Sequence, residues 1–294
     1  MLKTSAILIT ISAGAVLLWR ASSLGAGELA KHPCLDNVAV ESAVKHLRTA
    51  QKGSDMESVR SGIADAVDEL GEKHFATEML SSVESEAPTD IAQLQQGLGR
   101  VIESLTFRPW MEAEVPVGFP RFTPVHHIEV KTLPDYRMAR AAMPNTPSRG
   151  GNGAFWKLFS HIKRNDIAMT APVQMDYTGS DEDAEVASMA FLYGSRKIGN
   201  PGQDRADSGV EIVDIPKQDV VSIGVRGRMT PDSLEAAQRK LLKWLDDHKA
   251  EHRVAGPLRR MGYNSPFISE DRTFFEVQIP VEKVKKTVVA SSNS

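Results

Sequence analysis

The side chains best suited to bind a small molecule lie in one short segment of the chain. The predicted helix over 154–162 holds five large apolar side chains: Phe155, Trp156, Leu158, Phe159 and Ile162. One face of a helix can pack into a core, but five such residues exceed what one face needs. Either all five are core residues, or some are exposed and contact a ligand or a partner. His161 and Lys163 add an imidazole and a cation to the same segment.

Other groups that could do chemistry are sparse. His248 and His252 are four residues apart, a spacing that can hold a metal ion, but no third ligand follows in a recognisable pattern. We therefore expect an exposed helix end there and no metal site. Cys34 is the only cysteine, which excludes an intrachain disulfide, a paired-cysteine zinc site and a CxxCH attachment motif.

Recognisable catalytic motifs are absent from the sequence. It contains no Gly-x-Ser-x-Gly elbow, no HExxH, no phosphate-binding glycine-rich loop and no dinucleotide fingerprint. The formal net charge of −3 gives no electrostatic reason to expect nucleic acid as a partner. These observations favour a noncatalytic protein, with an enzyme acting on an apolar small molecule as an open alternative.

The apolar helix sits within a β-rich region that repeats one order of elements. Strands are predicted at 122–131, 136–143, 167–177 and 186–193, around the helix 154–162. The order then starts again with strands at 210–215 and 220–228, a helix that opens at Thr230-Pro231, and a strand at 273–281. Two strand–strand–helix–strand halves can close a barrel-like core with two helices outside. The predicted class is α+β.

The region before it, residues 28–110, has a different character. Its apolar residues recur at helical spacing in three stretches, 40–47, 56–70 and 91–105. Acidic residues outnumber basic ones here, whereas the rest of the chain is close to neutral. No motif in this region indicates a reaction. We expect a small all-helical segment that acts as a spacer or binds a protein partner.

The first 26 residues resemble a targeting segment. Lys3 precedes an apolar run from Ala6 to Trp19, which Arg20 closes. This is the arrangement of an export signal, and small residues suited to cleavage follow. Trp19-Arg20 also resembles the interfacial end of a short membrane anchor. Both predictions place the protein outside the cytoplasm, either periplasmic or attached to a membrane.

A family resemblance covers roughly residues 115–285. The helix 155–162, a short polar link and Ile167-Ala-Met-Thr-Ala-Pro-Val173 are similar to the core signature of SOUL heme-binding proteins. The similarity continues through 189–193 and 220–227, and it closes with Gly262-Tyr-Asn-Ser-Pro-Phe267 and 272–279. The resemblance implies a distorted β-barrel flanked by two helices. It also implies noncovalent binding of heme or another tetrapyrrole beside the first helix.

A tetrapyrrole is a flat apolar disc with carboxylates, so its site needs apolar side chains, cations and sometimes an axial ligand. The candidate contacts are Phe155, Trp156, Leu158, Phe159, His161, Ile162, Lys163 and Arg272. Lys163 and Arg272 would meet the carboxylates. His161 is the histidine nearest the signature, although family members differ in whether they use an axial histidine.

The sequence thus predicts an organisation and a leading function. Residues 1–26 are the export signal or anchor, 28–110 the helical segment, 111–285 the SOUL-like domain, and 286–294 a tail. The leading function is noncatalytic tetrapyrrole binding, for carriage, buffering or sensing of heme. A protein-interaction scaffold without a ligand remains the alternative from a different class.

Overall fold

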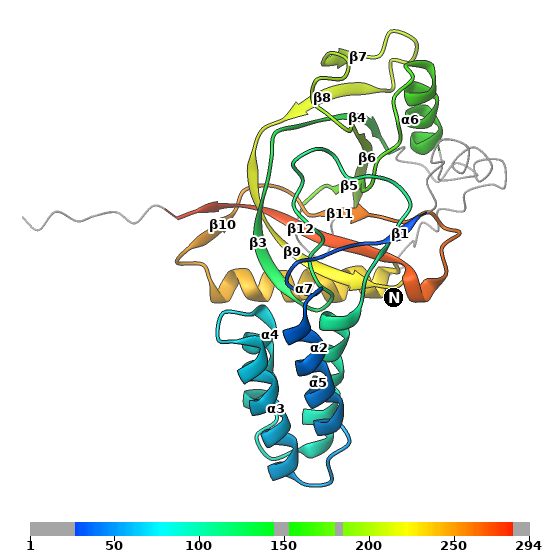
Figure 1. The fold of residues 1–294 in the computed structure, drawn as a ribbon. Coiled ribbons are helices and arrows are strands. Elements are labelled where there is room, and N and C mark those ends of the chain that lie inside the picture. Colours follow the sequence, from blue (N-terminus) through cyan, green and yellow to red (C-terminus); the bar gives the residue numbers. More distant parts are fainter. Residues whose placement is uncertain (1–26, 144–152, 180–184, 285–294) are drawn as a thin grey trace, which may run out of the picture.

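The computed structural model describes residues 27–143, 153–179 and 185–284. The segment predicted as an export signal or anchor and the tail 286–294 lie outside these ranges. Within them, no helix combines the length and the hydropathy needed to cross a bilayer. Figure 1 shows a helical bundle at one end of the molecule and a large sheet with two further helices at the other.

The bundle consists of α2 (Val38–Ala50), α3 (Met56–Leu70), α4 (Phe75–Glu86) and α5 (Ile91–Thr106). Helices α2, α3 and α5 match the three predicted stretches, and α4 is an additional helix. The side chains of Asn37, Asp55 and Asp90 accept hydrogen bonds from the first turns of α2, α3 and α5. These caps satisfy backbone N–H groups that have no partner within the helix.

The region after the bundle is built on a ten-stranded antiparallel sheet. Its strands are β3 (Ile128–Leu133), β4 (Tyr136–Ala142), β5 (Val173–Tyr177), β6 (Val186–Leu192), β7 (Gly202–Gln203), β8 (Glu211–Ile215), β9 (Gln218–Arg226), β10 (His252–Val254), β11 (Arg259–Gly262) and β12 (Phe274–Lys283). Their order is β3-β9-β12-β11-β5-β6-β4-β8-β7, and β10 pairs with β12.

This strand order shows how the two predicted halves fit together. Each half supplies two strands, a helix and further strands, in the order expected from the sequence. The first strand of each half pairs with the other half: β3 joins β9, and β8 joins β4. Strands β5 and β11 meet at the centre. The mixed helix and sheet class is confirmed.

The barrel detail of the prediction is not confirmed. Strands β3 and β7 end the sheet order, and no pairing between them closes the sheet within the described residues. The two end strands pair on one edge only, β3 with β9 and β7 with β8, and β7 is too short, at two residues, to form an extended closing ladder. Two helices cover the sheet as predicted: α6 (Gly153–Arg164) packs on β4 and β6, and α7 (Pro231–Asp247) packs on β9 and β12.

The bundle and the sheet share one apolar core rather than touching through a linker. The rings of Phe107, just after α5, and Phe274 in β12 have centroids 6.0 Å apart. Phe122 meets the same Phe274 ring edge-on at 5.7 Å. Short strands β1 (Glu28–Leu29) and β2 (Trp110–Met111) pair with each other and frame the two ends of the helical segment. The helical segment is therefore built into the fold.

Candidate functional site

The apolar stripe of α6 lies inside the protein. Phe155, Leu158, Phe159 and Ile162 are each less than 5% exposed, because this face of the helix packs on β4 and β6. Trp156 is half-buried, and its ring meets those of Phe155 and Phe159 edge-on at 5.6 and 5.9 Å. Of the five apolar candidates, only Trp156 presents appreciable surface. The other four are core residues, which was one of the two alternatives that the sequence left open.

His161 is buried at the same helix and uses both ring nitrogens. Nδ1 lies 2.5 Å from the Oδ2 atom of Asp204, and Nε2 lies 2.6 Å from the hydroxyl oxygen of Tyr193. Burial opposes ionisation of Asp204, but hydrogen bonds from the Ala206 N–H and His161, with the charge of Arg164, outweigh it and lower the pKa of Asp204. Burial raises the pKa of Tyr193 to about 12. His161 therefore has no nitrogen available to bind a metal in this arrangement.

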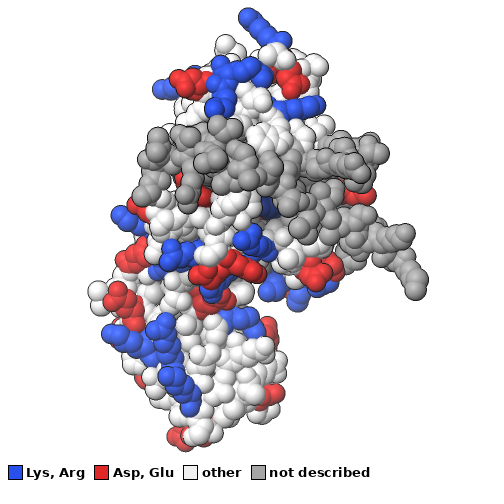
Figure 2. Space-filling model, turned by 90° about the vertical axis from the view of Figure 1, so that its right-hand side faces the viewer, with Lys and Arg blue, Asp and Glu red and all other residues white. Residues whose placement is uncertain are grey.

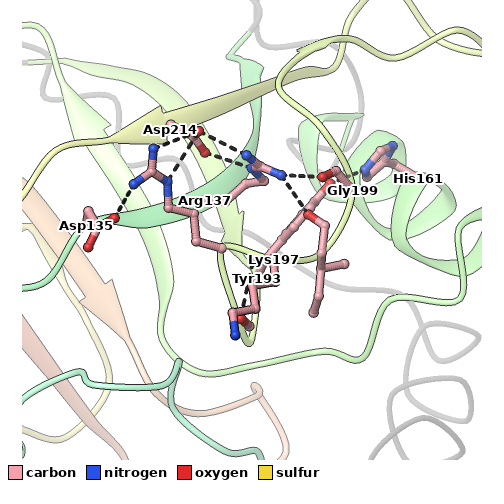
Figure 3. Close-up of polar contacts among 10 residues, drawn as sticks. Asp135, Arg137, His161, Tyr193, Lys197, Gly199 and Asp214 are labelled. Atoms are coloured by element: carbon pink, nitrogen blue, oxygen red, sulfur yellow. Dashed lines mark hydrogen bonds and ion pairs between the residues drawn. The ribbon is translucent and has the colours of Figure 1, made fainter.

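The loop that carries Asp204 is held in place by a second set of polar contacts. Arg137 donates to both carboxylate oxygens of Asp214, at 2.7 and 2.9 Å, and to the backbone oxygen of Ile198 at 3.0 Å. Figure 3 shows Arg137 between Asp214 and the backbone near Gly199, with Tyr193 and His161 beside it. These contacts hold the loop against β4, and the contacts of Asp204 with His161 and Arg164 join it to α6.

The two predicted cations do not come together. Lys163 is exposed at the end of α6, where its Nζ atom lies 5.9 Å from the centroid of the Phe159 ring. Arg272 is also exposed, and its guanidinium lies 5.3 Å from the centroid of the Trp110 ring in β2. Because β2 belongs to the helical segment and α6 packs on β4 and β6, Arg272 is not part of the α6 surface.

A cleft of about 580 Å³ lies at the junction between the bundle, α7 and the end of β9. Its volume falls in the range of about 300–1,000 Å³ that small-molecule sites occupy. One wall is the side of α7 that carries Ala236, Ala237 and Lys240. Another is the end of β9 from Ile223 to Arg226, together with Gly227, which follows it. The remaining side chains that line this junction cleft are Glu103, His126, Ser233, Glu270 and Asp271.

Three charged or titratable side chains meet in the junction cleft. Nε2 of His126 lies 2.7 Å from one carboxylate oxygen of Glu103, and Nη1 of Arg226 donates to the other oxygen at 2.8 Å. Burial opposes ionisation of Glu103, but the hydrogen bonds and charges of His126 and Arg226 outweigh it and lower the pKa of Glu103. These contacts join α5 to the sheet. Sequence reasoning missed them.

Lys240 adds a cation to the junction cleft. Burial lowers the pKa of Lys240, and the nearby charge of Arg100 lowers it further, while Glu86 partly offsets both. Across the described ranges, Lys240 forms no ion pair with a carboxylate. Figure 2 shows basic and acidic side chains interspersed over the visible face, without a broad field of one sign.

The comparisons with known proteins identify the family. A protein-family model described as "SOUL heme-binding protein" matches residues 119–280, which is more than half of the chain. That stretch begins before β3 and ends within β12, so it spans both halves of the sheet and both covering helices. The chain belongs to the SOUL heme-binding protein family. No curated protein matches it.

Solved structures give only a loose likeness. The C-terminal domain of EcmrR is 19% identical over 53% of this chain and 98% of that one, with a TM-score of 0.40. A hydrolase from Listeria innocua is 12% identical over 55% and 94% of the two chains, with a TM-score of 0.39. SAV2435 bound to tetraphenylphosphonium is 12% identical over 53% and 93%, with a TM-score of 0.34. At these TM-scores the likenesses carry no weight for function.

The family suggests a tetrapyrrole, and the two regions fit such a group differently. At α6 the apolar stripe is buried and both ring nitrogens of His161 have hydrogen-bond partners. Only Trp156 and Lys163 remain accessible to a ligand among the α6 candidates. At the junction cleft, an imidazole, two cations and apolar side chains border open space. Those are the donor types that a tetrapyrrole with carboxylates requires. Within the described ranges, no cluster of three or more metal-ligating side chains exists.

Proposed function

We propose that this protein binds heme or a related tetrapyrrole noncovalently and without turning it over. The single observation that carries the proposal is membership of the SOUL heme-binding family over residues 119–280. The absence of catalytic motifs from the sequence supports a binding role in the carriage, buffering or sensing of heme.

At α6, we propose contact through the outward-facing Trp156 and Lys163, with His161 and the apolar stripe as support. Trp156 offers a ring for stacking, and Lys163 offers a cation for a carboxylate. Arg272 is proposed as a further cation for a ligand that reaches the helical segment.

We also propose that the first 26 residues export the chain or anchor it to a membrane. The basis is the sequence pattern of Lys3, the apolar run and Trp19-Arg20. Separation of periplasm and membrane fractions, followed by alkaline extraction, distinguishes a released protein from an anchored one. Recovery of the whole pool in the cytoplasm would overturn both versions.

The test of the binding proposal is a hemin titration of the full-length chain in mild detergent. We expect a saturable change of the Soret band at a fixed stoichiometry, above a control titration of the detergent alone. A featureless titration that matches the detergent control would overturn the proposal. Loss of the Soret band after addition of a reductant and oxygen would instead favour an enzyme that degrades the bound tetrapyrrole.

A further inference from the structure

The contact with Glu103 determines which ring nitrogen of His126 carries the hydrogen. Nη1 of Arg226 donates to one oxygen of Glu103 at 2.8 Å, and a carboxylate in such an ion pair can only accept hydrogen bonds. Nε2 of His126 must therefore carry the hydrogen in the 2.7 Å contact. In the neutral imidazole, Nδ1 then has the lone pair. Nδ1 has no hydrogen-bond partner anywhere in the described ranges. The side chain lines the junction cleft, and 29% of it is exposed.

A histidine that donates one N–H to a carboxylate and keeps the other nitrogen free has the arrangement of a metal ligand. In metal sites the carboxylate fixes the tautomer and the ring orientation, and it makes the imidazole more basic. His126 meets these conditions through Glu103. Arg226 in turn holds Glu103 by donating to its second oxygen at 2.8 Å.

The backbone fixes His126 in a conformation that few side chains adopt. Its φ angle is 65°, in the left-handed region, which is uncommon for residues other than glycine. The His126 N–H donates to the backbone oxygen of Gly224 at 3.1 Å. A Cβ at Gly224 would lie 2.1 Å from the backbone oxygen of Thr123, so this approach requires glycine. Residues held in such conformations by surrounding structure cluster at functional sites.

The rest of the junction cleft supplies the surroundings of a flat ligand. Ile223, Val225, Ala236 and Ala237 give it apolar walls, and the two alanines leave room beside α7. Lys240, which has no carboxylate partner among the described residues, and Arg226 offer cations. Glu270 and Asp271 also face the cleft and would repel carboxylates, so ligand carboxylates belong at Lys240 and Arg226.

A second cleft allows an internal comparison. It measures about 470 Å³ between α2 and α3 and contains His46, whose Nδ1 lies 3.6 Å from the Asp65 carboxylate. The His46–Asp65 distance exceeds that of a hydrogen bond, whereas the His126–Glu103 contact measures 2.7 Å. His46 therefore serves as a control for the loss of a histidine that borders a cleft without a carboxylate hydrogen bond.

From these observations we infer that the junction cleft is a metalloporphyrin site in which His126 is the axial ligand and Glu103 its positioning residue. The inference rests on the proposed function and deepens it, because it names a site distinct from α6. It also gives the helical segment a role, since Glu103 comes from α5.

The experiment compares hemin with metal-free protoporphyrin on the full-length chain and its variants. We expect His126→Ala to weaken hemin binding by about tenfold or more and to abolish the spectrum of a nitrogen-ligated iron. Protoporphyrin binding should change by less than about twofold, since it has no metal to coordinate. Added imidazole should restore the spectrum in His126→Gly. His46→Ala should match the wild type in every measurement.

A second pair of variants tests the cleft itself. Ala236→Trp fills the space beside α7 and should weaken the binding of both ligands by about tenfold. Glu235→Trp lies on the same helix outside the cleft lining and should have no effect. Glu103→Gln should leave a bound heme whose iron reduction potential is more positive, because a less basic imidazole stabilises the ferric state less.

The outcomes separate the two proposals. If hemin does not bind the wild type, the proposed function fails. If hemin binds the wild type and remains unaffected by His126→Ala and Ala236→Trp, the junction site is overturned while the proposed function stands. Circular dichroism and thermal melting establish that each variant is folded. His126→Gln, which retains a hydrogen-bonding side chain beside Glu103, repeats the test if the alanine variant is unfolded.

Discussion

The α6 region and the junction cleft each pair a histidine with a carboxylate, yet the two histidines are in opposite situations. His161 is 4% exposed, and its second nitrogen meets Tyr193. His126 lines the junction cleft with 29% of its side chain exposed, and its second nitrogen has no hydrogen-bond partner among the described residues. A fully partnered histidine stabilises the fold, whereas a partly partnered one at a cleft can bind a ligand. Proximity to the family signature therefore does not indicate which histidine keeps a ring nitrogen without a partner.

The largest expected loss of stability comes from a substitution in the apolar stripe of α6. Phe159→Ala should lower the free energy of unfolding by about 4 kcal/mol, because it removes a buried ring and leaves a cavity. Trp156→Ala, on the same helix but half-buried, should cost clearly less. Urea denaturation of both variants measures the difference. A Phe159→Ala variant as stable as the wild type would show that α6 is not a core helix.

The second prediction applies one substitution to both histidines. His161→Ala should lower the free energy of unfolding by about 3 kcal/mol, because it leaves a cavity and a buried Tyr193 hydroxyl without a partner, and it removes one hydrogen bond of the buried Asp204 carboxylate. His126→Ala should cost about 1 kcal/mol, since its contact with Glu103 is partly solvated. Thermal or urea melts measure both values. Equal losses would remove the contrast between the two regions.

The third prediction is that the free energy of unfolding depends on pH through His127, which lies where the bundle meets the sheet. Burial, with smaller effects from His74 and His32, lowers the pKa of His127 to about 4, and the ring of His127 packs on Phe75 of the bundle. In the unfolded chain the pKa is about 6.5. Below that pH the unfolded state binds a proton that the folded state does not, so stability falls as the pH drops from about 6.5 to about 4.

For His127 this loss amounts to about 2 kcal/mol between pH 7 and pH 5. His32, whose burial lowers its pKa to about 4, adds a loss in the same direction. Urea midpoints measured at both pH values test the effect. His127→Gln, which cannot titrate, should flatten part of the profile. An unchanged slope in that variant would assign the pH dependence to other groups.

The smallest expected effect is the coupling between Glu103 and Arg226. Both side chains are at least 30% exposed, so solvent screens their ion pair. A double-mutant cycle with Glu103→Gln and Arg226→Gln should give a coupling energy of about 0.5–1 kcal/mol. The same cycle on the Arg239–Glu235 pair of α7 is the surface control. A junction coupling below that control would show that the contact does not hold α5 to the sheet.

Local patterns in the sequence predicted much of the fold. The apolar spacing of α6 and the Thr230-Pro231 start of α7 are properties of consecutive residues, and both helices form where expected. Strand β11 was not predicted, because its four residues include Arg259 and Arg260 and show no alternation. Helix α4 was not predicted as a separate element, since its apolar stripe is short.

The site depends on contacts that no local pattern encodes. Asp204, the partner of His161, lies 43 residues away in a loop whose position depends on Arg137 and Asp214. The contact between Glu103 and His126 depends on how the bundle packs against the sheet. The strand predicted over 122–131 included His126 and His127, but β3 begins only at Ile128. The left-handed backbone at His126 had no signal that could be recognised beforehand.

The exchange of strands between the two halves also has a consequence for biosynthesis. Strand β12 is the last element of the described chain, yet it pairs with β9, β10 and β11. Strand β3, formed much earlier in synthesis, must wait for β9. Neither half can therefore complete its hydrogen-bonding pattern while the ribosome is still translating the second. A chain that stopped before Phe274 would expose the edges of β9 and β11, and unpaired edges of this kind lead to aggregation.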